Sequence, residues 1–227
     1  VVNTAEWTSE EFDGPSNYFV GKGKVDGLSA VVKSSREDNI LYHNNQDGTF
    51  TDVTEASGLK GRGWASDVAI CDYDEDGSLD VFITSMFGRD QLYRNNGNGT
   101  FIDVTKNVFE RTSFGAIGSK LFDYNGDGRL DLVVVDMHSD MWMGLDYDHT
   151  SLAAAREFET RRFDYFYGPK AEFDQAMRND EKDLERILDF SHDEVLFGNV
   201  LFKNTGAGKF EEVSQEANLE TFWPWGV

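Results

Sequence analysis

Oxygen-bearing side chains stand at alternate positions in two short segments of this sequence. The segment DYDEDGSLD begins at Asp72, and the segment DYNGDGRLD begins at Asp123. Carboxylates placed this closely repel one another unless something positive lies among them. In a tight loop, side-chain oxygens at positions 1, 3 and 5 converge, glycine at position 6 permits the bend, and the carbonyl at position 7 points inward. That arrangement is the front half of a Ca²⁺ loop, in which hard oxygen ligands hold a hard cation.

The spacing predicts two Ca²⁺ sites, each closed by a carboxylate at position 9. The predicted ligands of the first site are Asp72, Asp74, Asp76, the carbonyl of Ser78, and Asp80. Those of the second site are Asp123, Asn125, Asp127, the carbonyl of Arg129, and Asp131. An EF-hand is rejected because its position 12, which needs a glutamate, is occupied by Ile83 and Val134. The second site has one neutral ligand and is expected to bind more weakly, and plain Asp-Gly turns are the alternative for both.

Both segments belong to a longer repeat. LYHNNQDGTFTDVT begins at Leu41 and LYRNNGNGTFIDVT begins at Leu92, 51 residues later, and a third copy, LFKNTGAGKFEEVS, begins at Leu201. Each unit contains about four short strand-like runs, and Asn-Gly turns between strands predict hairpins. Four strands in roughly 50 residues are typical of a β-propeller blade. In the first unit Lys22 and Lys24 replace the first two carboxylates, so no ion is expected there.

The predicted fold is therefore all-β, a propeller of four-stranded blades with an α-helical insertion in the third blade. The insertion is placed at residues 140–193, which are rich in helix formers, and a hidden degenerate repeat is the alternative. Propellers close with 4–8 blades, so about three blades plus one strand are expected to belong to a longer polypeptide or to an assembly of copies. The predicted boundaries are an N-terminal segment at 1–17, blades at 18–60, 61–110 and 111–219, and the first strand of a next blade at 220–227.

Composition excludes several classes of function. Lys+Arg 21 against Asp+Glu 42 leaves a net charge of −21, which argues against binding to nucleic acid or to anionic membrane surfaces. No apolar run is long enough to span a bilayer. Cys71 is the single cysteine, so no internal disulfide is expected, and its acidic surroundings predict a buried, unreactive thiol. The sequence contains no nucleophile elbow, zinc motif or phosphate loop, so an enzyme is not expected.

The segments DYDEDGSLDVFITS, LYRNNGNGTFIDVT and DYNGDGRLDLVV resemble the FG-GAP/VCBS-type repeats of integrin α-subunit propellers. They are still more similar to the repeats of the ASPIC/UnbV and cartilage acidic protein group. The resemblance covers roughly residues 18–139 and 195–227, and the helical insertion departs from it. It implies a propeller with Ca²⁺ in its blade loops, secreted or on a cell surface, and used for adhesion or scaffolding.

Three functions are compatible with these features. The leading hypothesis is a non-catalytic, Ca²⁺-stabilised extracellular module that binds a protein partner, or further blades of a longer polypeptide, through the insertion at 140–193. Six aromatic residues between Phe158 and Phe173 make that segment a candidate surface. The second hypothesis is a carbohydrate-active propeller, such as a polysaccharide lyase, with a carbohydrate ligand. The third is a structural subunit of a surface filament or layer.

Overall fold

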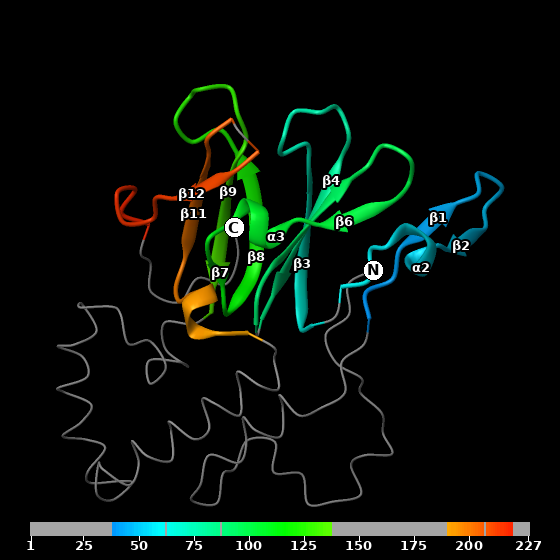
Figure 1. Cartoon of the computed structure of the whole chain (residues 1–227), viewed down its shortest axis with the longest axis horizontal. Helices are drawn as coiled ribbons and strands as arrows, with labels where there is room; N and C mark the ends of the chain where they lie inside the picture. The colour runs from blue at the N-terminus through cyan, green and yellow to red at the C-terminus, as the bar shows by residue number, and fades with distance from the viewer. Residues whose placement is uncertain (1–37, 62, 87, 138–189, 207, 220–227) are drawn as a thin grey trace, which may run out of the picture. The chain divides into compact units, whose positions relative to one another are not determined.

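The computed structural model describes residues 38–137 and 190–219, apart from positions 62, 87 and 207 (Figure 1). All of these residues belong to one compact unit of the chain. The predicted N-terminal segment, the start of the first blade, the strand at 220–227 and most of the predicted insertion lie outside the described residues. In the described part of the chain, no helix has both the length and the apolar character needed to cross a membrane.

The first complete sheet has four antiparallel strands in the order β3-β4-β5-β6 (Figure 1). Its strands are β3 (Ala65–Cys71), β4 (Asp80–Ser85), β5 (Gln91–Asn95) and β6 (Phe101–Asp103). In this register Phe82 of β4 pairs with Ala69 of β3 on one side and with Leu92 of β5 on the other. Every residue of β4 is buried. A strand that is covered on both faces favours a continuous run of apolar and β-branched residues, as its sequence DVFITS shows.

The second complete sheet has the same antiparallel pattern, in the order β8-β9-β11-β12. Its strands are β8 (Ala116–Phe122), β9 (Asp131–Asp136), β11 (Val200–Asn204) and β12 (Phe210–Glu212). Strands β9 and β11 are separated in sequence by residues 138–189, yet they pair directly, with Val134 opposite Val200. Every residue of β9 is buried, as in β4. Strands from both sides of the undescribed segment therefore complete one sheet.

Short elements connect and flank the two sheets. A separate hairpin is formed by β1 (Tyr42–Asn44) and β2 (Phe50–Asp52), and β7 (Thr112–Ser113) pairs in parallel with β10 (Val195–Leu196). The helical turns are α2 (Thr54–Ser57), α3 (Thr105–Val108) and the 3₁₀ turn η2 (His192–Glu194). Each of the first two turns begins with a threonine whose hydroxyl accepts a backbone N–H at the preceding hairpin, from Leu41 at 2.9 Å and from Leu92 at 2.8 Å. These bonds fix the chain where it leaves each hairpin.

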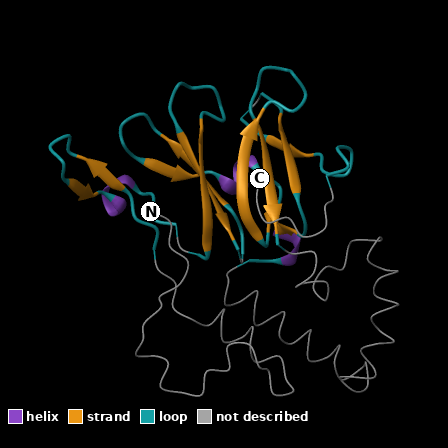
Figure 2. Ribbon diagram, turned by 180° about the vertical axis from the view of Figure 1, so that it is seen from behind, coloured by secondary structure: helices purple, strands orange, loops and turns teal. Residues whose placement is uncertain are grey.

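The two four-stranded sheets lie side by side (Figure 2), and an aromatic core packs between them. The ring of Phe109 lies 4.8 Å from that of Phe202, 5.1 Å from that of Phe210 and 5.8 Å from that of Phe82, measured between centroids. Such offset and edge-on pairs stabilise a core beyond the area they bury. Cys71, at the end of β3, belongs to the same core. The packing therefore holds the two sheets together close to the start of the first Asp-rich loop.

The all-β prediction is confirmed for the described residues. The predicted hairpins are present as β1–β2, β5–β6 and β11–β12, and each connection spans five residues. An asparagine at the end of the first strand shapes each turn; for example, the Oδ1 atom of Asn95 accepts the N–H of Gly97 at 2.9 Å. Closure of a propeller, the number of blades, their boundaries and the helical insertion stay predictions.

Candidate metal centre

The first loop, residues 72–80, connects β3 to β4. Asp72 holds its backbone, because one carboxylate oxygen accepts the N–H of Asp76 at 3.0 Å and the other accepts that of Gly77 at 2.9 Å. Gly77 has a φ of 88°, a left-handed conformation that glycine adopts without strain. Asp76 in turn accepts the N–H of Ser78 at 2.8 Å. The carboxylates therefore shape the loop through hydrogen bonds to its own backbone.

Asp80 closes the first loop from the first position of β4. Its side chain is fully buried, and its two oxygens accept the N–H groups of Tyr73 at 3.2 Å and of Asn95 at 2.8 Å. Burial is the largest cause that raises the pKa of Asp80 above its ordinary value. The charges of Asp74 and Asp76 add to this rise, and the two hydrogen bonds oppose it. A positive charge beside Asp80 would favour its ionised form.

Three carboxylates of the first loop converge on one another. Asp72, Asp74 and Asp80 each offer an oxygen, and these three atoms lie within 4.8 Å of one another. The Oδ1 atom of Asp74 is buried and has no hydrogen-bond partner among the described residues. Burial, and next the charge of Asp76, raises the pKa of Asp74. An orphaned oxygen among like charges fits a hard divalent cation, which would supply both the missing contact and the opposite charge.

The remaining predicted ligands of the first loop are placed differently. Asp76 is exposed and is not one of the three converging carboxylates, and its Oδ1 atom is engaged by the N–H of Ser78. Cys71, just before the loop, is buried as predicted. Burial, with the charges of three loop carboxylates, raises the pKa of its thiol to about 12. The thiol is therefore neutral near pH 7 and unsuited to nucleophilic chemistry.

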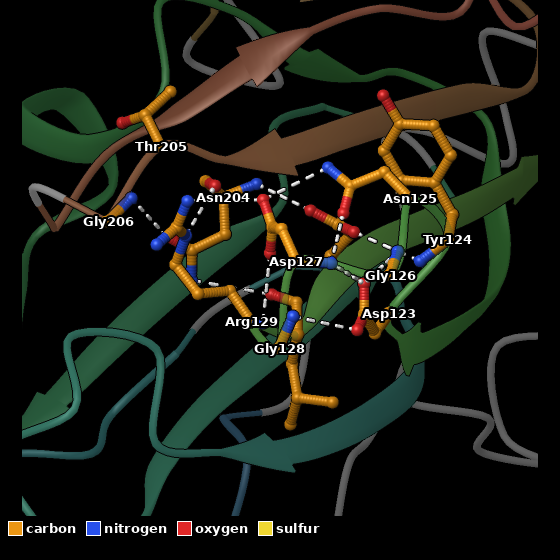
Figure 3. Close-up of polar contacts among 12 residues, drawn as sticks. Asp123, Tyr124, Asn125, Gly126, Asp127, Gly128, Arg129, Asn204, Thr205 and Gly206 are labelled. Carbon is orange, nitrogen blue, oxygen red and sulfur yellow. Dashed lines mark hydrogen bonds and ion pairs between the residues drawn. The ribbon is translucent and has the colours of Figure 1, made fainter.

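The second loop, residues 123–131, connects β8 to β9 and repeats this scaffold (Figure 3). Asp131 is fully buried, and its two oxygens accept the N–H groups of Tyr124 at 3.1 Å and of Asn204 at 2.8 Å. Asp123, at position 1, accepts three backbone N–H groups, those of Gly126 at 2.7 Å, Asp127 at 3.1 Å and Gly128 at 2.9 Å. The backbone of a loop with this spacing is thus held in the same way in both repeats.

The second loop differs in that Asp127 already has a cationic partner. The guanidinium of Arg129 lies 3.1 Å from one carboxylate oxygen, and the side-chain amide of Asn125 donates to the same oxygen at 3.1 Å. The backbone N–H of Arg129 is the largest cause that lowers the pKa of Asp127, and Asn125 and the guanidinium add to it. Among the described residues, three carboxylates converge in the first loop but not in the second. The second loop is therefore partly neutralised from within.

The two loops also differ in what covers them. Tyr73, at position 2 of the first loop, is buried, and its ring stacks on that of Phe210 with centroids 6.4 Å apart. A Cβ atom placed on Gly208 would lie 3.7 Å from the Cβ atom of Asp74, so the β11–β12 hairpin packs against the first loop. Tyr124, at the same position of the second loop, is 38% exposed. The first loop is therefore enclosed by the following repeat, and the second is more open to solvent.

Two functional contacts were not predicted from the sequence. The sequence predicts the carbonyl of Arg129 as a Ca²⁺ ligand. In the structure its side chain also forms an ion pair with Asp127 and donates to the carbonyl of Asn204 at 3.3 Å. Asn204 is not among the predicted site residues, although it aligns with Asn95 of the previous repeat. That alignment was the available signal, because both asparagines end a hairpin strand and donate to the position-9 carboxylate of their own repeat.

Two four-stranded sheets, each with an Asp-rich loop between its first two strands, define a β-repeat protein. The family model described as an FG-GAP-like repeat matches residues 19–83 and 72–134, which together make up more than half of the chain. The chain therefore belongs to the FG-GAP-like repeat family, and the resemblance found in its motifs is confirmed.

Cartilage acidic protein 1 of Homo sapiens is similar to this chain, with 31% identity over 117 residues. The proteins of the same name from Mus musculus and Xenopus tropicalis match over the same length, with 30% and 29% identity. In each case the match covers 44% of this chain and 17% of the relative. The chain thus matches only a small part of the length of these relatives.

Proposed function

We propose that the chain is a Ca²⁺-stabilised, non-catalytic module of an extracellular repeat protein, which serves protein–protein or cell-surface assembly. The observation that carries this proposal is the convergence of Asp72, Asp74 and Asp80, with the buried Oδ1 atom of Asp74 lacking a partner among the described residues. Such hard oxygen donors suit Ca²⁺, whereas Mg²⁺ prefers fewer protein ligands and keeps its waters. Bound Ca²⁺ would supply the positive charge that offsets their repulsion.

Asp72 and Asp80 connect cation binding to the stability of the fold. Asp72 holds the backbone of the first loop, and Asp80 joins that loop to β5 through the N–H of Asn95 at 2.8 Å. A cation that offsets the repulsion among these carboxylates while keeping them ionised would therefore stabilise the contacts among the loop, β4 and β5. Without a cation, the loop is the first part expected to open, because its like charges are left uncompensated.

The second loop is proposed as a weaker Ca²⁺ site. Its predicted ligand set includes one neutral side chain, Asn125, so it offers one carboxylate fewer than the first loop. Asp127 is also engaged by the guanidinium of Arg129, which a cation would have to displace or tolerate. Ligand charge sets calcium affinity, so both differences favour the first loop.

Assembly is supported by an exposed aromatic face on the second sheet. Phe122 and Tyr124 are 40% and 38% exposed, whereas their repeat equivalents, Cys71 and Tyr73, are buried against the following sheet. A further repeat placed in the same way would cover Phe122 and Tyr124. This supports a propeller completed by further blades or by copies of the chain. We also propose that the segment at 140–193 provides a surface for a partner.

An extracellular location agrees with the name of the relatives and with the acidic composition. The relatives are named as acidic proteins of cartilage, and this chain carries a net charge of −21. Extracellular modules bind Ca²⁺ with dissociation constants of about 10⁻⁴–10⁻³ M, and we propose that the two loops bind in this range.

Calorimetry and thermal unfolding of the full chain test the proposal. We expect chelator-treated protein to take up two Ca²⁺ ions with unequal affinities, and its melting temperature to rise. Mg²⁺ at the same concentration is the matched control, and it should produce a much smaller rise. Absence of both binding heat and a melting-temperature change at millimolar Ca²⁺ would show that the two loops are ordinary turns.

A further inference from the structure

Asn204 contacts both Asp-rich loops. It is the last residue of β11, and 2% of its surface is exposed. Its backbone N–H donates to Asp131, the position-9 carboxylate of the second loop, at 2.8 Å, and its carbonyl accepts a hydrogen bond from Arg129 (Figure 3). Its side-chain amide donates to the carbonyl of Tyr73, in the first loop, at 3.0 Å. One buried residue therefore joins two loops that belong to different repeats.

The contact with Tyr73 reaches the centre of the first loop. Tyr73 stands between Asp72 and Asp74, and its own N–H donates to Asp80 at 3.2 Å. These are the three carboxylates that converge. A continuous series of hydrogen bonds thus runs from Asp131 through Asn204 and Tyr73 to Asp80, and each end is a predicted Ca²⁺ ligand. Buried polar contacts of this kind are strong because water does not compete with them.

Asn95 provides the internal comparison. It occupies the repeat position of Asn204, and its backbone N–H donates to Asp80 in the same way, at 2.8 Å. Its side-chain amide donates to the carbonyl of Leu79, within the loop of its own repeat, at 3.0 Å, as that of Asn204 donates to the equivalent carbonyl of Leu130 at 3.4 Å. Both asparagines therefore donate their backbone N–H to the position-9 carboxylate. The side chain of Asn204 in addition donates to the preceding repeat, at Tyr73.

We propose that Asn204 is a positioning residue that couples the two Ca²⁺ loops, so that an ion at either loop raises the affinity of the other. This inference rests on the proposed function, since it presumes that both loops bind Ca²⁺. An ion that orders Asp131 also orders Asn204, whose amide then fixes the Tyr73 carbonyl between two ligands of the first loop. Coupling between sites is reciprocal, so the effect has the same size in both directions.

The test follows the Gly77 and Gly128 backbone amides by NMR during a Ca²⁺ titration, because each glycine reports on one loop. Asp74→Asn weakens the tighter first loop so that it no longer fills before the second, and we expect it to raise the midpoint observed at Gly128 by up to about fivefold, the lower end of typical couplings. In protein that carries Asn204→Asp, Asp74→Asn should leave the Gly128 midpoint unchanged. Asn204→Asp keeps the Oδ1 acceptor for the N–H of Gly206 and removes the donor to Tyr73 and to Leu130.

Asn95→Asp is the matched control, since it adds the same charge at the equivalent position and leaves the Tyr73 contact in place. Coupling should persist in that variant. Coupling that persists in Asn204→Asp would overturn the role of Asn204, and a Gly128 midpoint that does not respond to Asp74→Asn in otherwise unchanged protein would overturn coupling altogether. The latter comparison does not depend on the folding of an Asn204 variant. If neither glycine responds to Ca²⁺, the proposed function itself fails, which is a distinct result.

Discussion

The first and second Asp-rich loops hold their backbones with the same hydrogen bonds. In each, the carboxylate at position 1 accepts the N–H of the glycine at position 6, at 2.9 Å in both cases. In each, the buried carboxylate at position 9 accepts one N–H from position 2 and one from the asparagine that ends the third strand of its sheet. These three shared hydrogen bonds, in loops that begin 51 residues apart, make the scaffold a property of the repeat.

The difference lies in how each loop compensates its negative charge. In the first loop the pKa values of Asp74 and Asp80 are raised, chiefly by burial. In the second loop the pKa of Asp127 is lowered, with the Arg129 guanidinium among its partners. The first loop therefore keeps a repulsion among its carboxylates that an external cation can offset. In the second loop, Arg129 already offsets part of the negative charge. The same motif can thus yield sites of different calcium dependence.

Exchanging the residues at position 3 should change this comparison most. Asp74→Asn removes the carboxylate with the orphaned oxygen and leaves a neutral side chain at position 3, as in the second loop. The stabilisation by Ca²⁺ at the first loop should therefore fall, by up to about 2.7 kcal/mol at a free concentration 100 times the dissociation constant. For a chain of this size a complete loss would correspond to roughly 5–10 °C in melting temperature. In chelator Asp74→Asn should be at least as stable as the unchanged protein, because burial disfavours the ionised Asp74.

The reciprocal change, Asn125→Asp, should act in the opposite direction in the second loop. It adds a carboxylate, so it should increase the stabilisation by Ca²⁺ and reduce stability in chelator. Thermal unfolding of both variants with Ca²⁺ and with chelator measures these effects. Equal shifts under the two conditions would mean that position 3 affects only the turn, and that neither loop is a metal site.

Exchanging the residues at position 7 should have a smaller effect on affinity. Arg129→Ser frees Asp127 from its ion pair, which is partly exposed and therefore modest, so Ca²⁺ affinity at the second loop should rise roughly two- to fivefold. Ser78→Arg should lower the affinity of the first loop by a similar factor. Calorimetric titration measures both. Lys60→Ser, after α2 in another repeat, removes the same charge and controls for net charge, and an equal rise in that variant would contradict a local role for Arg129.

The local pattern of the sequence predicted the sheets well, because the signal for a strand is contained in the strand itself. The buried runs DVFITS and DLVVVD are β4 and β9, and the segments from Gln91 and from Phe101 are β5 and β6. The asparagine-rich turns gave all three hairpins for the same reason. Closure into a propeller depends on contacts among distant repeats, and no local pattern determines how many repeats are present.

The site was predictable only as far as one repeat determines it. Spacing identified the carboxylates of both loops, and three of them converge in the first. The exposure of Asp76 and the ion pair of Arg129 depend on side-chain orientation, which spacing leaves open. The contact of Asn204 with Tyr73 joins positions 131 residues apart in the chain, so it could be found only after the sheets were placed side by side.

A last prediction concerns the surroundings of the short parallel pair β7–β10. In the described part of the chain, the first sheet has no counterpart of this pair. Glu194, beside β10, contacts Lys106 at 2.7 Å and Arg89 at 3.6 Å, and both cations belong to the preceding repeat. The hydrogen bond from Lys106 is the largest cause that lowers the pKa of Glu194 below its ordinary value of 4.5. Its ionised form therefore stabilises the folded chain above about pH 4.5, and this contribution is lost as the pH falls through the lowered pKa.

Glu194→Gln should accordingly reduce the free energy of unfolding at pH 7 by at most about 1 kcal/mol, the usual range for a partly exposed pair. At acidic pH, where Glu194 is protonated in both the folded and the unfolded chain, the variant and the unchanged protein should become equally stable. Urea unfolding at both pH values measures the difference. Glu55→Gln, which removes the more exposed partner of Lys60, is the matched control and should change stability less. A difference that stays constant with pH would mean that the side chain of Glu194 acts through uncharged contacts, such as the hydrogen bond that it accepts from the N–H of Ser191, and not through its charge.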